Sequence, residues 1–339
     1  MEINYEHHLG AHCESGVTSN LLNYYGYNYS EPLIFGLSGS LFFAHLPFIK
    51  LRGIPITVFR PLPGVMFKRV TQLLGFKINK KKFFNPKKAA KQLDNLVEKG
   101  IPTGCVTGLY HLPYLPEEWK FHFNGHNVCV IGKDGDNYLI SDPAVMEKVT
   151  ISSKDLLRAR FAKGTFPPLG KLYWIKSLPK ETPDLNKLVR KAILKNCYRM
   201  IHQPGPVPYV GVNAFNLLGS RIPEYPKKYG EKKAAQFLVR IINMMEQVGT
   251  GGAGFRFLYA AFLQEAAEIT GISELNKFSQ KLTDIGDQWR IFTSNAGRIL
   301  KKRSSENVNY QTLGDLLKEI GRQEKSFFTD LEKIIKNYS

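Results

Sequence analysis

The sequence predicts an α+β domain over residues 1–180 followed by an all-helical domain over residues 181–339, and the length of 339 residues allows two domains. Two observations indicate this division. In the first part, short runs rich in β-branched and aromatic residues alternate with a few helical segments, whereas in the second part apolar residues recur at helical spacing. Between them the stretch KSLPKETPDLN, at residues 176–186, contains two prolines and is typical of a linker.

The first domain is expected to mix short helices and strands. Helices are predicted at residues 14–24 and 86–99, and a third at residues 154–162, for which Ser152 or Ser153 is a suitable N-cap. Strands are predicted in the β-rich runs IPTGCVTGL (101–109), NVCVIG (127–132), NYLIS (137–141) and KLYWIKSL (171–178).

The second domain is expected to be helical throughout. Helical spacing of apolar residues predicts helices at residues 185–201, 231–248, 253–269, 275–292 and 312–337. The segments GPVPYVG (205–211) and GTGGAG (249–254) are predicted turns between them. GTGGAG precedes a helix and could hold an anion with its backbone N–H groups, but a plain flexible connection fits it better, because it lacks both phosphate-binding loop signatures.

Composition excludes several classes of protein. The chain is 43% apolar and 22% charged, which suits a folded protein, and it has no run of about 18 apolar residues that would predict a transmembrane helix. The N-terminal sequence lacks the basic and apolar regions of a secretory signal, so we expect a cytoplasmic protein. The four cysteines form no CxxC pair, which argues against a zinc ribbon, a redox motif or a disulfide framework and favours free thiols.

The net charge of +18 is concentrated in one stretch. From Lys50 to Lys91 there are twelve Lys or Arg residues and no acidic residue. Such a stretch attracts acidic proteins, polyanions or anionic membrane surfaces, although a solvated surface with no specific partner is the simpler interpretation. Nucleic acid is disfavoured as the partner, because no zinc finger, RRM signature or helix-turn-helix accompanies the lysines.

Cys13 is the first candidate for a chemical role. It lies between a glycine-containing turn and the predicted helix at residues 14–24. The N-terminus of a helix stabilises a thiolate through the helix dipole and unpaired N–H groups, as an activated nucleophile requires. The alternative is a buried cysteine that acts as a small apolar side chain.

His126 and Asp142 are predicted neighbours at the open end of a β-hairpin. The turn signal Asp134-Gly135 joins the strands NVCVIG and NYLIS, and this turn places His126 opposite residue 143 and Asp142 opposite residue 127. A carboxylate there fixes the tautomer of the imidazole and leaves its other nitrogen to pair with a thiol. A cysteine followed much later by His and Asp on adjacent strands is the order of papain-like cysteine enzymes. A structural histidine and a turn aspartate are the alternatives.

The chain resembles a known family. The segments AHCESGVTSNLLNYYG and SEPLIFGLSGSLFF resemble the opening of the butirosin-biosynthesis H protein family, whose N-terminal domain is related to C39-like, papain-fold cysteine peptidases. The motifs LPY and GH-x-V-x-V-x-G…D-P resemble the later part of that domain. GTGGAGFRFLYAAFLQEAA resembles the helical domain usually attached to it.

The resemblance implies an acyltransferase of antibiotic or other secondary metabolism. The namesake of the family moves an acyl group from the phosphopantetheine of an acyl carrier protein to an aminoglycoside amine. Carried onto this chain, Cys13 is the nucleophile, His126 the base and acid, and Asp142 the residue that orients the imidazole. The phosphopantetheine comes with the acidic carrier protein, and no metal or cofactor bound to this chain is implied. A cysteine peptidase or amidase with the same three residues is the alternative, and a binding module with an inactive Cys13 is a third.

The sequence departs from papain-like enzymes at one position. These enzymes usually carry a Gln six residues before the cysteine, where its side chain binds the oxyanion. Here that position is His7, which we expect to donate in its place, with His8, His12 or a backbone N–H as alternatives. Glu31 is a candidate for an acid near Cys13, although helix capping is the simpler interpretation.

Three further residues are candidates for substrate binding. Arg256 shares a helical stripe with Tyr259 in an otherwise apolar helix, so its charge is expected to meet a buried acid or a substrate anion. Tyr114 is predicted to line a cleft beside the hairpin, and aromatic packing is its alternative role.

Overall fold

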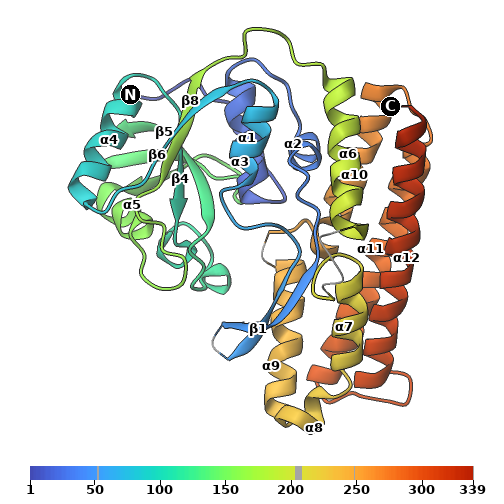
Figure 1. The fold of residues 1–339 in the computed structure, drawn as a ribbon. Helices are drawn as coiled ribbons and strands as arrows, with labels where there is room; N and C mark the ends of the chain where they lie inside the picture. The colour runs from blue at the N-terminus through green and yellow to red at the C-terminus, as the bar shows by residue number, and fades with distance from the viewer. Residues whose placement is uncertain (52, 203–207, 248, 339) are drawn as a thin grey trace. The chain divides into compact units, whose positions relative to one another are not determined.

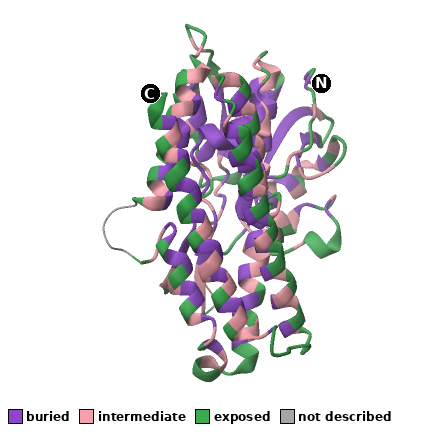
Figure 2. Ribbon diagram, turned by 90° about the vertical axis from the view of Figure 1, so that its right-hand side faces the viewer, coloured by how far each residue is buried: buried purple, intermediate pink, exposed green. Residues whose placement is uncertain are grey.

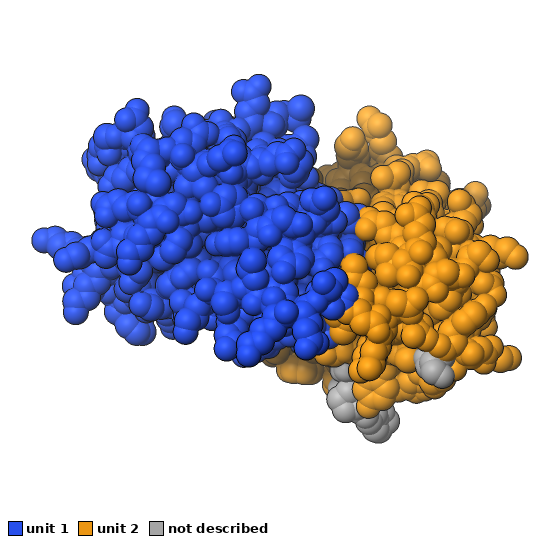
Figure 3. Space-filling model, turned by 90° about the horizontal axis from the view of Figure 1, so that it is seen from above, with its two compact units in different colours: residues 1–34, 62–183 blue, residues 35–61, 184–339 orange. Residues whose placement is uncertain are grey.

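The computed structural model describes residues 1–51, 53–202, 208–247 and 249–338. It divides into two compact units, each described here by itself. Unit 1 consists of residues 1–34 and 62–183, and unit 2 of residues 35–61 and 184–339 (Figures 1 and 3).

Unit 1 is an α+β unit built on a six-stranded antiparallel sheet with the strand order β3-β8-β4-β5-β6-β7. The strands are β3 (Lys77–Lys81), β4 (Thr103–Thr107), β5 (His126–Asp134), β6 (Asn137–Ser141), β7 (Val149–Ser152) and β8 (Leu172–Ser177). Its helices are α1 (Cys13–Tyr24), α3 (Met66–Leu73), α4 (Pro86–Glu98) and α5 (Ser153–Arg160), with 3-10 turns at Leu109–His111 and Glu117–Trp119. Apolar side chains of α4, α5 and the sheet, including Leu93, Leu156 and Val128, form one buried core.

The local predictions for unit 1 are largely confirmed. Helix α1 begins one residue earlier than expected, and α4 covers residues 86–98. The four predicted strand runs coincide with β4, β5, β6 and β8, although β5 extends beyond its predicted run at both ends. Ser152 caps α5, since its side chain accepts a hydrogen bond from the N–H of Asp155 at 3.0 Å. The short strand β3 lies in the lysine-rich stretch and was not predicted, because its alternation of polar residues lacks an apolar face.

The hairpin of β5 and β6 is confirmed, but its register differs from the predicted one. Asp134 pairs with Asn137, and a bulge between Val130 and Gly132 shifts the pairing so that Cys129 lies opposite Ser141. Continued by one residue, this register places Asp142 opposite Val128 and therefore on the same face of the sheet as His126. The predicted register would have put Asp142 opposite Asn127 and therefore on the other face of the sheet. The bulge therefore decides whether the two side chains can meet.

Unit 2 is mainly helical. Its helices are α6 (Leu185–Ile201), α7 (Asn213–Arg221), α8 (Tyr225–Tyr229), α9 (Glu231–Ile242), α10 (Arg256–Thr270), α11 (Leu275–Leu300) and α12 (Tyr310–Asn337), with a π-helical turn at Asn243–Gln247 and a 3-10 turn at Ala253–Phe255. Helix α2 (Glu31–Leu37) crosses the division between the units at residue 34. Buried and exposed residues alternate along the long helices as the apolar spacing predicted (Figure 2). The end of the predicted helix 231–248, at Val248, and part of the predicted turn 205–211 lie outside the described residues.

One segment assigned to the first domain by sequence belongs to unit 2. Strands β1 (Ala44–Leu51) and β2 (Ile54–Val58) form a separate antiparallel pair, and residues 35–61 pack with the helices of unit 2. The reason is aromatic packing. Phe43 and Phe59, which flank this pair, lie against the buried ring of Trp289 with centroid distances of 6.0 and 5.5 Å. The other boundary falls between Pro183 and Asp184, inside the predicted linker.

The GTGGAG segment is a turn that is buried at Ala253 and Gly254 and exposed at Gly249 and Gly251. Gly251 to Phe255 all have positive φ, and a Cβ on Gly254 would lie 2.2 Å from the ring of Phe59. Glu246 accepts a hydrogen bond from the N–H of Ala253 at 3.3 Å, so a side chain of the protein occupies the position of the suggested anion.

Candidate active site

Cys13 is the first residue of α1. His12 is the N-cap, with extended backbone and a side chain that accepts a hydrogen bond from the N–H of Ser15 at 3.3 Å. Among the four cysteines, Cys13 is partly exposed and the other three are buried. The thiol therefore lies at the positive end of a helix, as the sequence predicted, and it is within reach of solvent.

His126 and Asp142 form a buried hydrogen-bonded pair. The distance from His126 Nε2 to Asp142 Oδ2 is 2.7 Å, and the side chains are 5% and 0% exposed. His126 also makes a hydrogen bond with Cys13. Because Asp142 occupies Nε2, the other ring nitrogen, Nδ1, is the one available to the thiol. The structure thus brings Cys13, His126 and Asp142 together in the predicted order.

The electrostatics of this group favour a charged imidazole. Burial alone would lower the pKa of His126, but the charges of Asp142 and Cys13 and hydrogen bonds to both raise this pKa well above its ordinary value. Burial would raise the pKa of Asp142, but the charge of His126 and hydrogen bonds from His126, the N–H of Ala144 and Tyr114 hold it below its ordinary value. A negatively charged Asp142 beside a protonated His126 is the favoured state.

Tyr114 supports Asp142, and its expected place in a substrate cleft stays a prediction. Its hydroxyl donates a hydrogen bond to Asp142 Oδ2 at 2.9 Å. Burial and the charge of Asp142 raise the pKa of Tyr114 well above its ordinary value, so the phenol keeps its proton and remains a donor. The sequence placed Tyr114 correctly beside the hairpin, but could not show which way its hydroxyl points.

Glu31 holds the turn that leads into Cys13. Its carboxylate accepts hydrogen bonds from the N–H of Ala11 at 2.7 Å, the N–H of His12 at 2.8 Å and the hydroxyl of Ser15 at 2.7 Å. Burial raises the pKa of Glu31, and these hydrogen bonds oppose the rise without reversing it. This geometry agrees with the expectation that Glu31 is an acid near Cys13. Glu31 acts on the turn before α1.

The end of the hairpin packs directly on α1. Gly10 donates its N–H to the carbonyl of Pro143 at 2.9 Å, and a Cβ on Gly16 would lie 2.7 Å from Pro143 Cβ. Pro143 follows Asp142. The absence of a side chain at Gly16 therefore allows the segment that carries Asp142 to approach α1, which carries Cys13.

The expectation that His7 donates to an oxyanion is wrong. His7 Nε2 donates to the carbonyl of Val145 at 3.0 Å, and Nδ1 lies 2.8 Å from the hydroxyl of Ser141. Both ring nitrogens are therefore engaged in anchoring the N-terminal segment. Of the alternatives, His8 lies 3.5 Å from the carboxylate of Glu6, and His12 caps α1.

The substrate-binding roles expected for Arg256 and Tyr259 are also wrong. Arg256 is 0% exposed, and its Nε and Nη2 each donate to the Glu324 carboxylate at 2.8 Å. Of the two partners expected for Arg256, a buried acid or a substrate anion, the structure shows the buried acid. Tyr259 is 0% exposed in the core of unit 2, where burial raises its pKa well above the ordinary value.

Two polar residues near Cys13 were missed. The carboxylate of Glu14 is buried and accepts hydrogen bonds from the N–H groups of Gly64 and Met66, both at 2.9 Å, at the start of α3. Asn127 lies in the buried part of β5, with Nδ2 3.9 Å from Cys13 Sγ. A polar residue in an otherwise apolar strand was the available signal for Asn127.

A cysteine at a helix N-terminus beside a His–Asp pair on an antiparallel sheet is the arrangement of papain-like cysteine enzymes. Comparison with known families agrees with this class. The model of the N-terminal domain of butirosin biosynthesis protein H matches residues 12–143, a range that contains Cys13, His126 and Asp142. A second model, described as a domain of unknown function (DUF4872), matches residues 154–331, more than half of the chain. The chain belongs to this family, with the butirosin biosynthesis protein H type of N-terminal domain preceding DUF4872.

Among solved structures, the chain is similar to one described as a putative C39-like peptidase from Bacillus anthracis. The identity is 16%, the TM-score is 0.37, and the match covers 53% of this chain and 100% of that chain. No curated protein matches the chain. In the described ranges, no helix has the length and apolar character needed to cross a membrane.

Proposed function

We propose that the protein is a cysteine-dependent acyltransferase that moves an acyl group from a thioester to an amine. The observation that carries this proposal is the contact of a partly exposed helix-terminal thiol with a buried, hydrogen-bonded His126–Asp142 pair. Membership of the family supports acyl transfer within this class, since the family model that matches residues 12–143 is named after a biosynthesis protein.

The proposed reaction uses the three side chains in turn. The thiolate of Cys13 attacks the thioester carbonyl, and the C–S bond of the donor breaks while protonated His126 gives its proton to the departing thiol. The acyl group is then a thioester of Cys13. An amine attacks this carbonyl and loses its proton to His126, and Cys13 leaves as the thiolate. The products are an amide and a free thiol, and the enzyme returns to its starting state.

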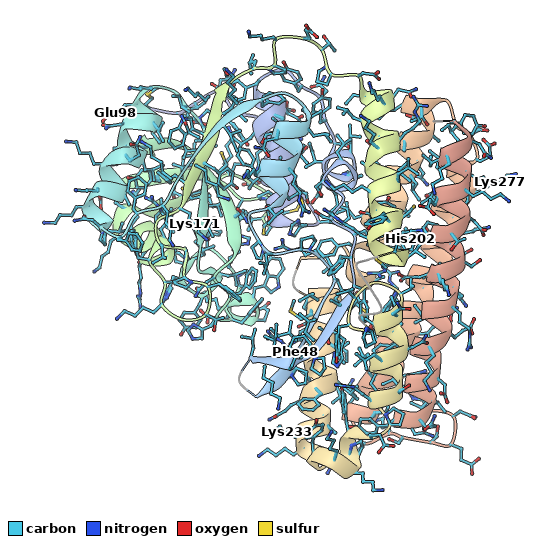
Figure 4. The ribbon with its side chains drawn as sticks, in the orientation of Figure 1. Phe48, Glu98, Lys171, His202, Lys233 and Lys277 are labelled. Carbon is cyan, nitrogen blue, oxygen red and sulfur yellow. The ribbon has the colours of Figure 1, made fainter. Side chains whose placement is uncertain are left out.

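The donor we propose is an acyl group carried by an acidic carrier protein. The eight exposed lysines of the basic stretch in unit 1 are Lys68, Lys77, Lys80, Lys81, Lys82, Lys87, Lys88 and Lys91. Their charge is dense: burial lowers the pKa of Lys171, which is labelled in Figure 4, and the charges of Lys80 and Lys82 lower it further. Phe84, which is 80% exposed, lies among them. A basic surface with an exposed aromatic ring suits an acidic protein partner.

The fate of the acyl-enzyme tests the proposal. The protein is loaded with a short acyl thioester, freed of donor, and divided between buffer and a series of amines, and the acyl mass on the protein is followed with time. A transferase loses its acyl group faster as the amine concentration rises and forms the corresponding amide. Loss at the same rate in buffer and in every amine, with release of the free acid, would instead identify a hydrolase with the same nucleophile. With a carrier-bound donor, loading should slow as salt rises, whereas loading from the free thioester should not.

A further inference from the structure

Asn127 enters the site from the strand that carries His126. Its side chain is 1% exposed, and its Nδ2 donates toward Cys13 Sγ at 3.9 Å. A buried amide on an apolar strand is costly unless each of its polar atoms has a partner. The partners of Asn127 therefore show what the amide is arranged to do.

Two hydrogen bonds fix which end of the amide faces the sulfur. Nδ2 donates to the carbonyl of Gly125 at 3.1 Å, and a carbonyl can only accept, so the nitrogen cannot be exchanged with the oxygen. Oδ1 accepts a hydrogen bond from the hydroxyl of Tyr173 at 2.9 Å. One N–H of the amide is thus used by Gly125, and the second is directed at Cys13 Sγ.

Tyr173 is itself held firmly. It is 3% exposed on β8, its ring lies 4.4 Å from that of Phe67, and a Cβ on Gly104 would lie 2.1 Å from its ring. Burial raises the pKa of Tyr173 well above its ordinary value, and nearby negative charges add to the rise, so the hydroxyl stays protonated. Tyr173 therefore acts as a permanent donor to Asn127 Oδ1.

We propose that Asn127 is a further catalytic residue, which donates an N–H to the thiolate of Cys13, and that Tyr173 is the positioning residue that orients its amide. This proposal rests on the proposed function, in which Cys13 is the nucleophile. Papain-like enzymes usually carry a Gln six residues before the cysteine, but here that residue is His7, and both of its ring nitrogens are engaged. Asn127 nevertheless gives the site a side-chain amide, at the sulfur of Cys13. A donor to the thiolate favours the charged form of the thiol and lowers its pKa.

The test is the pH dependence of Cys13 alkylation by iodoacetamide in the full chain. Cys13→Ala supplies the background, and the remaining thiols react slowly because they are buried; burial raises the pKa of Cys105 to about 11. Asn127→Ala should raise the apparent pKa of Cys13 by about one unit and slow alkylation below that pKa about tenfold. Asn127→Asp, which keeps the size but places a negative charge near the sulfur, should raise it further. Tyr173→Phe should shift it in the same direction by less.

Asn137→Ala, an exposed asparagine at the start of β6, is the matched control and should keep the wild-type profile. An unchanged apparent pKa in Asn127→Asp and Tyr173→Phe would overturn the proposal, even if Asn127→Ala did not fold. Alkylation needs no acyl donor. A protein that fails to accept acyl groups yet shows the Asn127 shift would refute the acyltransferase function alone, and one that accepts them without the shift would refute the role of Asn127 alone.

Discussion

The protonation of His126 depends on both of the other residues of the site. His126 lies between Asp142 and Cys13, and both raise its pKa against the effect of burial. In the proposed reaction the protonated imidazole is the acid of the first step. The rate of acyl transfer to Cys13 should therefore fall at high pH only as His126 loses its proton, well above the ordinary histidine range.

Asp142→Asn tests this directly. The amide removes the negative charge that raises the pKa of His126, so the fall in acylation rate at high pH should move to lower pH. The maximum rate should also drop by roughly 10²–10⁴-fold, because the imidazole loses the partner that fixes its tautomer. The measurement is the acylation rate as a function of pH for both proteins. An identical high-pH limit in the two proteins would mean that Asp142 does not control His126.

Residue-level prediction from sequence succeeded where order along the chain carries the information. Cys13, His126 and Asp142 were found from a helix start, a turn signal and their spacing. His7 failed because its spacing to Cys13 says nothing of Ser141 and Val145, which take its ring nitrogens.

The same limit applies to long-range partners. Arg256 was known to need a partner, but its acid, Glu324, lies 68 residues further along the chain. Asn127 was missed because its contacts arise only when β5, β8 and α1 are assembled.

At the scale of elements, the junction between α1 and the end of the hairpin aligns the site. Gly16→Ala should disturb it, because the added Cβ would lie 2.7 and 2.9 Å from Pro143 Cβ and Cγ. We expect a loss of about 1–3 kcal/mol in the free energy of unfolding, measured by denaturant titration. Gly297→Ala in α11, where a Cβ meets nothing within 4 Å, is the matched control. It should be stabilising by about 0.5–1 kcal/mol, so equal effects of the two substitutions would contradict this account.

Elements with strong local signals were predictable, and their exact pairing was not. Helices α1 and α4 and the β5–β6 hairpin follow from caps, apolar spacing and the Asp134-Gly135 turn. The bulge between Val130 and Gly132 has no such signal, although it sets the face on which Asp142 lies. The N-terminal segment pairs with β5 at this bulge, and a Cβ on Gly132 would lie 2.8 Å from the carbonyl oxygen of Met1.

At the scale of the whole molecule, the division into an α+β part and a helical part was predictable from the change in apolar spacing. The membership of residues 35–61 was not, because Phe43 and Phe59 join the core of unit 2 through contacts with Trp289, far away in the chain. Hydrophobic patterns show that a residue is buried but not which partner buries it.

The core of unit 2 also depends on the buried ion pair of Arg256 and Glu324. Arg256→Met should leave the Glu324 carboxylate buried without its partner and cost about 3–5 kcal/mol in the free energy of unfolding. Arg322→Met, which removes an exposed pair with Glu319 on α12, should have little effect. Thermal unfolding of the two variants makes the comparison. A stable Arg256→Met protein with weakened substrate binding would restore the substrate role that the structure argues against.

In the proposed function, Cys13 carries the acyl group. The most direct measurement is the intact mass of the full-length protein after incubation with a panel of acyl thioesters, followed by mapping of the modified peptide. We expect an added mass of one acyl group, located on Cys13, and no such mass in Cys13→Ala. An adduct of equal size in Cys13→Ala, or one that maps to another residue, would contradict the claim.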